Sequence, residues 1–134
     1  MHYLTRRFQF SASHRLHSEA LDADCNQDIY GLCTNVHGHN YRLEITLRGE
    51  PDPRTGFFCN VMELHRVVQE KIVDPCEHQY LNELPLFQGV ITTMENLAQV
   101  IWRTIEPDVQ AWGIELHEVL LAETDDNLVR LRQD

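Results

Sequence analysis

Two stretches of the chain alternate apolar and polar side chains, and no other feature limits the possible folds as much. The first covers residues 3–14 and the second begins at His39. The apolar residues at alternate positions are Phe8, Phe10, Ala12, Tyr41, Leu43, Ile45 and Leu47. A period of two is typical of strands that bury one face and expose the other. We therefore expect a sheet with one covered face.

Two segments in the middle of the chain have the spacing of amphipathic helices. The first is expected to continue until Pro75, and its apolar residues are Leu64, Val67, Val68 and Ile72. The second is expected to begin at Thr92, which forms a capping box with Glu95, and to end at Pro107. Its apolar stripe consists of Leu97, Ala98, Ile101, Trp102 and Ile105.

The last part of the chain is expected to form a hairpin. Residues 115–123 and 127–132 are predicted strands, and Asp125-Asp126-Asn127 is a turn signal between them. The order strand, strand, helix, helix, strand, strand predicts an α+β fold with a four-stranded antiparallel sheet and two helices packed on one face. Residues 18–36 lack a clear pattern and are expected to form a long loop. With no internal repeat or linker, residues 1–134 are predicted to be a single domain.

The charge balance excludes several classes of partner. Eleven basic and 21 acidic residues give a net charge of -10, which argues against binding to nucleic acid or to an anionic membrane. No segment approaches the roughly 20 apolar residues of a membrane span. The N-terminus also lacks the apolar run of a signal peptide. We therefore expect a cytoplasmic protein, in which the four cysteines are thiols or metal ligands rather than disulfides.

Three histidines are placed to bind one metal ion. His37 and His39 are two residues apart on a predicted strand, so their side chains point to the same face. His14 ends the first strand on the parity of its apolar residues. If the two strands pair antiparallel, the three imidazoles meet at one end of the sheet. Three neutral imidazoles with a fourth position open are typical of a catalytic zinc site, whereas structural sites usually have four protein ligands.

A rival metal site would use Cys25, Cys33, His37 and His39 as the four ligands of a structural zinc ion. This spacing does not match a standard zinc finger or ribbon, so the three-histidine site is favoured. Taken alone, His14 could also be a satisfied, partly buried histidine without a ligand. The cysteines without an assigned role are Cys25, Cys59 and Cys76.

Four short motifs follow one another along the chain. They are Phe10-Ser11-Ala12-Ser13-His14-Arg15-Leu16, His37-Gly38-His39-Asn40-Tyr41, Glu95-Asn96-Leu97-Ala98 and Glu123-Thr124. In this order they resemble the 6-pyruvoyl-tetrahydropterin synthase family, whose bacterial branch contains the 6-carboxytetrahydropterin synthases of queuosine biosynthesis. The resemblance covers nearly the whole chain. It implies the tunnelling fold (T-fold), in which subunit sheets join into a barrel and two trimers stack as a homohexamer.

The resemblance also implies a cofactor and a substrate. Zinc would be bound by His14, His37 and His39, and the substrate would be 7,8-dihydroneopterin triphosphate. In the family, a glutamate in the last hairpin anchors the pterin ring, and this position is Glu123. Its carboxylate offers two acceptor oxygens for the N–H groups of the pterin edge. Thr93 corresponds to a residue that lines the pterin pocket.

The catalytic roles implied by the resemblance fall on three further residues. Cys33 would be the proton acceptor, with Glu77 and His78 completing a relay that helps to form the thiolate. Zinc would acidify the C–H bond next to the substrate hydroxyls, and triphosphate would then be eliminated. The family usually has Asp at the position of Glu77, so the additional methylene could loosen the relay. Arg15 is a hypothetical contact of the triphosphate.

The sequence contains conflicting signals about the product. Three residues separate Cys33 from His37, a spacing that resembles the 6-carboxy branch, in which acetaldehyde is also released. Asn60, Thr92-Thr93 and residues 123–127 instead resemble the 6-pyruvoyl branch. Because the cysteine lies at the chemistry, the sequence favours 6-carboxy-5,6,7,8-tetrahydropterin as the product, with 6-pyruvoyl-tetrahydropterin as the alternative. Alternatives from other classes are a catalytically inactive, zinc-stabilised pterin-binding module and a zinc hydrolase that needs no thiol.

Overall fold

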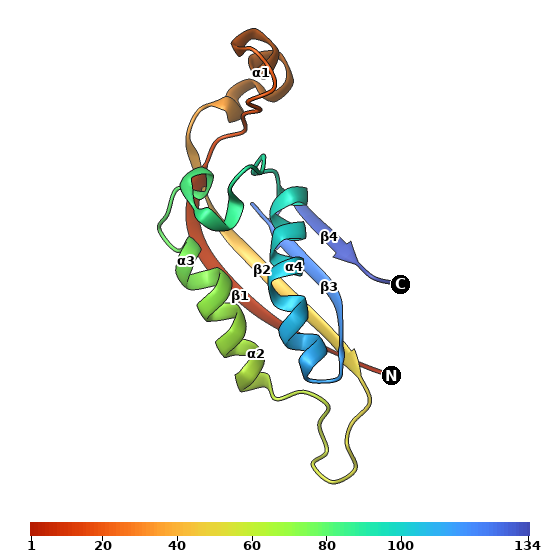
Figure 1. Cartoon of the computed structure of the whole chain (residues 1–134). Helices are drawn as coiled ribbons and strands as arrows, with labels where there is room; N and C mark the ends of the chain where they lie inside the picture. The colour runs from red at the N-terminus through yellow and green to blue at the C-terminus, as the bar shows by residue number, and fades with distance from the viewer.

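Four antiparallel strands form one sheet in the order β1-β2-β3-β4 (Figure 1). The strands are β1 (His2–His14), β2 (His37–Gly49), β3 (Glu115–Ala122) and β4 (Leu128–Arg132). This computed structural model describes all residues from 1 to 134. The α+β class and the four-stranded antiparallel sheet predicted from the sequence are confirmed.

The pairing of the two long strands β1 and β2 determines the geometry at the end of the sheet. They pair from His2 opposite Gly49 to His14 opposite His37, and Ala12 lies opposite His39. Side chains of cross-strand partners point to the same face of a sheet. The end of the first strand therefore lies beside the start of the second, as the alternation predicted.

Two long helical segments cover one face of the sheet (Figure 1). The first is α2 (Val61–Val68), which continues through a π-helical turn, η2 (Gln69–Val73), into α3 (Asp74–Cys76). The second is α4 (Met94–Ala111). Two short 3₁₀ turns, η3 (Leu81–Glu83) and η4 (Pro85–Phe87), connect the two segments. None of these helices combines the length and the apolar character that crossing a bilayer requires.

Both predicted ends of the second helix were wrong. The N-cap is Thr93, whose hydroxyl oxygen accepts a hydrogen bond from the backbone N–H of Asn96 at 3.2 Å, and Thr92 is fully buried outside the helix. Pro107 does not end the helix, which continues to Ala111. A proline inside a helix removes one backbone hydrogen bond. Burial of Val109, one turn after the buried Ile105, favours continuation of the helix against the sheet.

The segment predicted as a long loop contains a helix, α1 (Ala23–Tyr30), followed by the 3₁₀ turn η1 (Gly31–Thr34). Asp22 caps α1 by accepting a hydrogen bond from the backbone N–H of Cys25. The side chain of Asn26 is buried and bonds to the backbone of Ser18, Leu21 and Asp22. Figure 1 shows that this segment projects beyond the end of the sheet. Polar contacts hold it, which explains why apolar periodicity did not reveal it.

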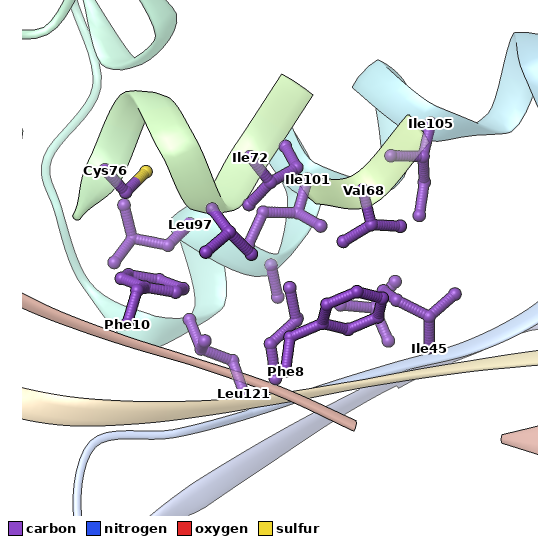
Figure 2. Packing of buried hydrophobic residues seen from close by; sticks show 14 of the residues in the cluster. Phe8, Phe10, Ile45, Val68, Ile72, Cys76, Leu97, Ile101, Ile105 and Leu121 are labelled. Carbon is purple, nitrogen blue, oxygen red and sulfur yellow. The ribbon is translucent and has the colours of Figure 1, made fainter. Parts of the chain in front are cut away.

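The core lies between the sheet and its two helical segments. Figure 2 shows Phe8, Phe10 and Leu121 from the strands facing Ile72 and Ile101 from the helices. The outer face of the sheet has no helical cover (Figure 1). The buried apolar residues of β1 and β2 face the helices, and His14, the end of β1, is buried on the same side.

Substitution of Ile101 by alanine is expected to destabilise the protein by about 2–5 kcal/mol, because it leaves a cavity in a close-packed interior. Ile101 is fully buried in the middle of α4. Met62→Ala is the matched control, since Met62 is an exposed apolar residue on α2 and its loss is expected to change stability by less than about 0.5 kcal/mol. Urea unfolding of the three proteins measures both changes. Equal effects of the two substitutions would contradict this packing.

Candidate active site

Three histidines meet on the helix-facing side of the sheet, at the end of β1 and the start of β2. The ring centroids of His14 and His37 are 4.6 Å apart, those of His14 and His39 are 5.1 Å apart, and those of His37 and His39 are 5.0 Å apart. Their ligand nitrogens all lie within 4.8 Å of one another. We refer to these residues as the histidine triad. The predicted strand pairing thus brings the three imidazoles together.

The hydrogen bonds of the histidine triad leave nitrogens free for a metal ion. The Nδ1 atom of His14 lies 2.8 Å from the carbonyl oxygen of Thr92, and that of His37 lies 2.8 Å from the carbonyl oxygen of Asn35. A carbonyl only accepts, so each Nδ1–H donates and Nε2 keeps its lone pair. The Nε2 atoms of His14 and His39 are buried and have no hydrogen-bond partner. A cation at this point would satisfy both, so the residues fit a divalent metal.

Burial keeps His14 and His39 in the protonation state that binds metal. His14 is only 1% exposed, and this burial lowers its pKa to about 4. Burial also lowers the pKa of His39, and the neighbouring His37 acts in the same direction. Removal from water disfavours the charged imidazolium. His14 and His39 are therefore neutral at pH 7, and a neutral imidazole is the form that coordinates metal ions.

Glu123, directly after β3, places a carboxylate beside the triad. Its Oε1 lies 3.7 Å from Nε2 of His14, and its Oε2 lies 3.8 Å from Nε2 of His39. These distances are too long for hydrogen bonds, and the low pKa values of the rings argue against ion pairs. Burial raises the pKa of Glu123; His37 opposes this effect, and the charge of Glu95 adds to it. The alternation in the sequence could not show which face of the sheet Glu123 occupies. In the structure, Glu123 lies two residues after the fully buried Leu121 and therefore on the same face.

Two residues at the triad were not assigned to this site from the sequence. Tyr41 is fully buried, its ring lies against those of His14 and His39, and its hydroxyl has no hydrogen-bond partner. Burial raises the pKa of Tyr41, and the charge of Glu123 adds to this increase. Thr92 holds His14 through its carbonyl oxygen. The parity of Tyr41 with His39 was a usable signal, whereas Thr92 was misread as a helix cap.

Thr93, predicted to line the pterin pocket, caps α4 through its hydroxyl oxygen. This structural contact is sufficient to explain a threonine at the position. The role of Thr93 in binding substrate stays a prediction.

Glu77 and His78 lie together at the outer edge of β1. The Nε2 atom of His78 is 3.2 Å from Oε1 of Glu77, and the same oxygen accepts a hydrogen bond from the backbone N–H of Ser11 at 3.1 Å. The backbone N–H of His78 donates to the carbonyl of Ser11 at 2.6 Å. His78 has a φ of 57°, which is uncommon for a residue other than glycine, and its side chain is 80% exposed. Glu77 can thus orient His78 despite its longer side chain.

Cys33 lies in η1, four residues before His37. Its carbonyl oxygen accepts a hydrogen bond from the backbone N–H of Leu16, two residues after His14. Its exposed thiol makes no hydrogen bond, to His78 or to any other residue of the chain. The group of possible metal ligands contains the three histidines and no cysteine, so the rival site with Cys25 and Cys33 is not formed.

The other two cysteines are structural. Cys59 and Cys76 are buried in the core, and burial raises the pKa of both thiols, that of Cys76 to about 12. Burial in apolar surroundings makes a thiol unreactive. These residues therefore take no part in the chemistry of the site.

The fold and the site together define an α+β domain with three convergent imidazoles, an adjacent carboxylate and an exposed thiol in the turn before the second strand. The model of the family described as 6-pyruvoyl tetrahydropterin synthase matches residues 3–134. The chain belongs to this family of lyases. The 6-pyruvoyl tetrahydrobiopterin synthase of Dictyostelium discoideum is 42% identical over 130 residues, which cover 96% of this chain and 94% of that protein.

Structural comparison agrees with the sequence comparison. The solved structure of 6-pyruvoyl tetrahydropterin synthase from Caenorhabditis elegans superimposes with a TM-score of 0.90 at 30% identity, covering 98% of this chain and 95% of that one. This likeness confirms the predicted T-fold for the subunit. A protein of Archaeoglobus fulgidus with the provisional name 6-carboxy-5,6,7,8-tetrahydropterin synthase is 30% identical over 101 residues, 75% of this chain and 79% of that protein.

Proposed function

We propose that this protein is a zinc-dependent lyase that eliminates triphosphate from 7,8-dihydroneopterin triphosphate and forms 6-pyruvoyl-tetrahydropterin. The observation that carries the proposal is the histidine triad, in which buried Nε2 atoms lack partners beside the carboxylate of Glu123. Three imidazoles with room for a further ligand are typical of catalytic zinc. The substrate class comes from the relatives, which are named for pterin chemistry.

The choice of product differs from the one that the sequence favoured. The spacing between Cys33 and His37 pointed to the 6-carboxy branch. The relative with a 6-pyruvoyl name is 42% identical over 130 residues, and the one with a 6-carboxy name is 30% identical over 101 residues. This difference supports the former alternative. The residues around Glu123 and Thr92 are then better indicators of the branch than the cysteine spacing.

The chemistry can be divided among residues of this chain. A bound zinc ion supplies Lewis-acid polarisation of the hydroxyls on the substrate side chain. The thiolate of Cys33 accepts the proton from the adjacent carbon, and the electron pair of the broken C–H bond forms a double bond as the C–O bond to triphosphate breaks. Triphosphate leaves with the electrons of that bond. The enol that remains becomes a methyl ketone by taking up a proton at its terminal carbon. The other hydroxyl-bearing carbon loses its C–H and O–H protons, and ring atoms C6 and N5 gain two protons as their double bond is reduced, so the tetrahydro ring and the second carbonyl form without an external oxidant. Glu123 accepts hydrogen bonds from the bound pterin.

The relay of Glu77 and His78 needs a second subunit in this proposal. The side chains of Cys33 and His78 are exposed and form no hydrogen bond with each other in one chain. The outer edge of β4 is also unpaired, and an exposed sheet edge is a surface for pairing with another chain. We therefore propose that Cys33 of one subunit meets His78 of another in the predicted hexamer.

The cytoplasmic location stays a prediction.

The test is a product analysis with zinc-loaded protein and 7,8-dihydroneopterin triphosphate, read by mass spectrometry of the pterin. A 6-pyruvoyl product supports the proposal. A 6-carboxy product with acetaldehyde would restore the branch that the cysteine spacing favoured. Unchanged substrate with zinc still bound would contradict the enzymatic function and favour the pterin-binding module. Protein stripped of metal is the control, and it should leave the substrate unchanged.

A further inference from the structure

A cavity of about 560 Å³ opens beside the chain segment that follows His14. It is formed between residues 15–20 and residues 80–91, and the polar side chains in its wall include Arg15, His17 and Asn82. Its volume lies within the range of small-molecule sites. The roles assigned above to the histidine triad, Cys33 and His78 do not use it.

Arg15 is a partly buried cation in this cavity without a carboxylate partner. Seven other arginines lie within 4 Å of a carboxylate; they are Arg7, Arg42, Arg48, Arg54, Arg66, Arg130 and Arg132. Arg15 forms no such pair, although the protein has 21 acidic residues. Its Nη2 lies 3.1 Å from Nδ1 of His17, and its buried Nε has no partner. A desolvated cation without a counter-ion is unfavourable, so this site favours an anionic ligand.

The backbone of Arg15 is held firmly in place. Its N–H donates to the side-chain oxygen of Asn82 at 2.9 Å, and its carbonyl accepts from the side-chain N–H of Asn82 at 2.9 Å. The hydroxyl of Thr92 donates to the same carbonyl at 3.1 Å. The fixed backbone sets the position from which the Arg15 side chain extends. The planar guanidinium suits two parallel hydrogen bonds to a phosphate.

The acidic residues of the cavity lie at its rim. Glu19 approaches Nε2 of His17 at 3.6 Å, but its side chain is 97% exposed and free to turn into solvent. Glu83 is exposed as well. Neither carboxylate is within 4 Å of the Arg15 guanidinium. The interior of the cavity therefore presents the cation and the histidine to a ligand.

The cavity is next to the metal centre through a shared residue. Thr92 accepts a hydrogen bond from His14 through its carbonyl and donates one to Arg15 through its hydroxyl. His14 and Arg15 are consecutive, so their Cα atoms are about 3.8 Å apart. The metal centre and the cavity are thus neighbours in the fold, joined through the two hydrogen bonds of Thr92. A substrate that spans both would bring its phosphate chain to Arg15.

We propose that the cavity at Arg15 and His17 is the subsite for the triphosphate group of the substrate, with Arg15 as its main phosphate-binding residue. This inference rests on the proposed function, because it takes the pterin triphosphate as the substrate. It extends that function by assigning the phosphate chain to residues outside the triad. Arg15 then contributes to substrate binding and to holding the leaving group, while proton transfer occurs elsewhere.

The test is calorimetric titration of the zinc-loaded protein with inorganic tripolyphosphate, which requires no turnover. Arg15→Gln is expected to weaken binding by about 10- to 100-fold, the range for hydrogen bonds to charged groups. Arg15→Lys keeps the charge but not the bidentate geometry, so it should fall in between. Arg103→Gln is the matched control, since Arg103 is an exposed arginine on α4 that also lacks a carboxylate partner. Its binding should equal that of the unaltered protein.

The same comparison is repeated in a His37→Ala background, because a bound metal ion also attracts phosphates. In that background, the protein with Arg15 should still bind tripolyphosphate more tightly than the Arg15→Gln variant. Equal binding by the Arg15→Gln variant and the parent, or equal weakening by the Arg103→Gln variant, would overturn the subsite. Unaltered zinc content in the Arg15→Gln variant separates loss of a phosphate contact from damage to His14. If tripolyphosphate binds through Arg15 but the substrate is not converted, the subsite stands and the proposed function fails.

Discussion

Replacement of Cys33 by alanine is expected to lower kcat by about 10²- to 10⁴-fold, the usual contribution of a positioned general base. Zinc content and pterin affinity should stay the same. The thiol is exposed, makes no hydrogen bond and lies outside the group of possible metal ligands, so its removal disturbs no contact of the triad. Steady-state turnover, metal analysis and pterin fluorescence titration measure the three quantities on one preparation.

Cys25→Ala is the matched control, since Cys25 is an exposed cysteine of α1 in the same projecting segment. It should retain full activity. Retained activity in the Cys33→Ala variant would exclude the thiol as the base and favour a zinc hydrolase. Loss of zinc together with activity would instead indicate that Cys33 is a metal ligand.

Co-expression of the Cys33→Ala and His78→Ala chains tests whether the two residues meet between subunits. Neither variant should be active alone. In a mixed oligomer, some interfaces combine an intact Cys33 from one chain with an intact His78 from the other, so part of the activity should return. If both residues acted within one chain, no mixed site would be complete, and the mixture would stay inactive.

The parts of the site that depend on strand parity could be predicted from the sequence. His14, His37 and His39 follow from alternation and antiparallel pairing, because a period of two fixes the face of each side chain once two strands are aligned. The register of β1 and β2 then places His14 opposite His37. The same rule applied to Tyr41 would have placed it beside the triad.

The parts that depend on local polar contacts could not be predicted. The helix α1 has eight residues, and the only one that it buries is the polar Asn26, so it leaves no apolar stripe in the sequence. The pair Thr92-Thr93 offers two equivalent caps, and only the tertiary bonds of Thr92 to His14 and Arg15 separate their roles. Glu123 follows adjacent leucines on opposite faces, so its orientation required the observed register of β3.

Removal of an imidazole from the triad is expected to have the second large effect. His14→Ala should weaken zinc binding by more than about 100-fold, because even the hydrogen-bonding partners of metal ligands contribute about 10- to 100-fold. The activity should decrease together with the fraction of protein that carries zinc. Competition with a chromogenic zinc chelator measures the affinity, and His2→Ala, which alters an exposed histidine of β1, should behave as the unaltered protein.

His14 is buried and bonded to Thr92, so the His14→Ala variant could lose zinc merely by unfolding. His37→Ala removes a partly exposed ligand instead, and it should lose zinc while keeping the fold. Tight zinc binding in both variants would contradict the three-histidine site.

The pH dependence of the metal-free protein reports the environment of His14 independently of zinc. Burial lowers the pKa of His14 from 6.5 to about 4, so between these pH values the unfolded chain binds a proton that the folded chain does not. The free energy of unfolding should therefore decrease as the pH falls from 6.5 toward 4. In the His14→Ala variant this part of the decrease should disappear. An unchanged pH dependence, measured by urea unfolding, would mean that the ring is hydrated in the folded protein. The metal would then have to drive its dehydration, rather than find neutral imidazoles already in place.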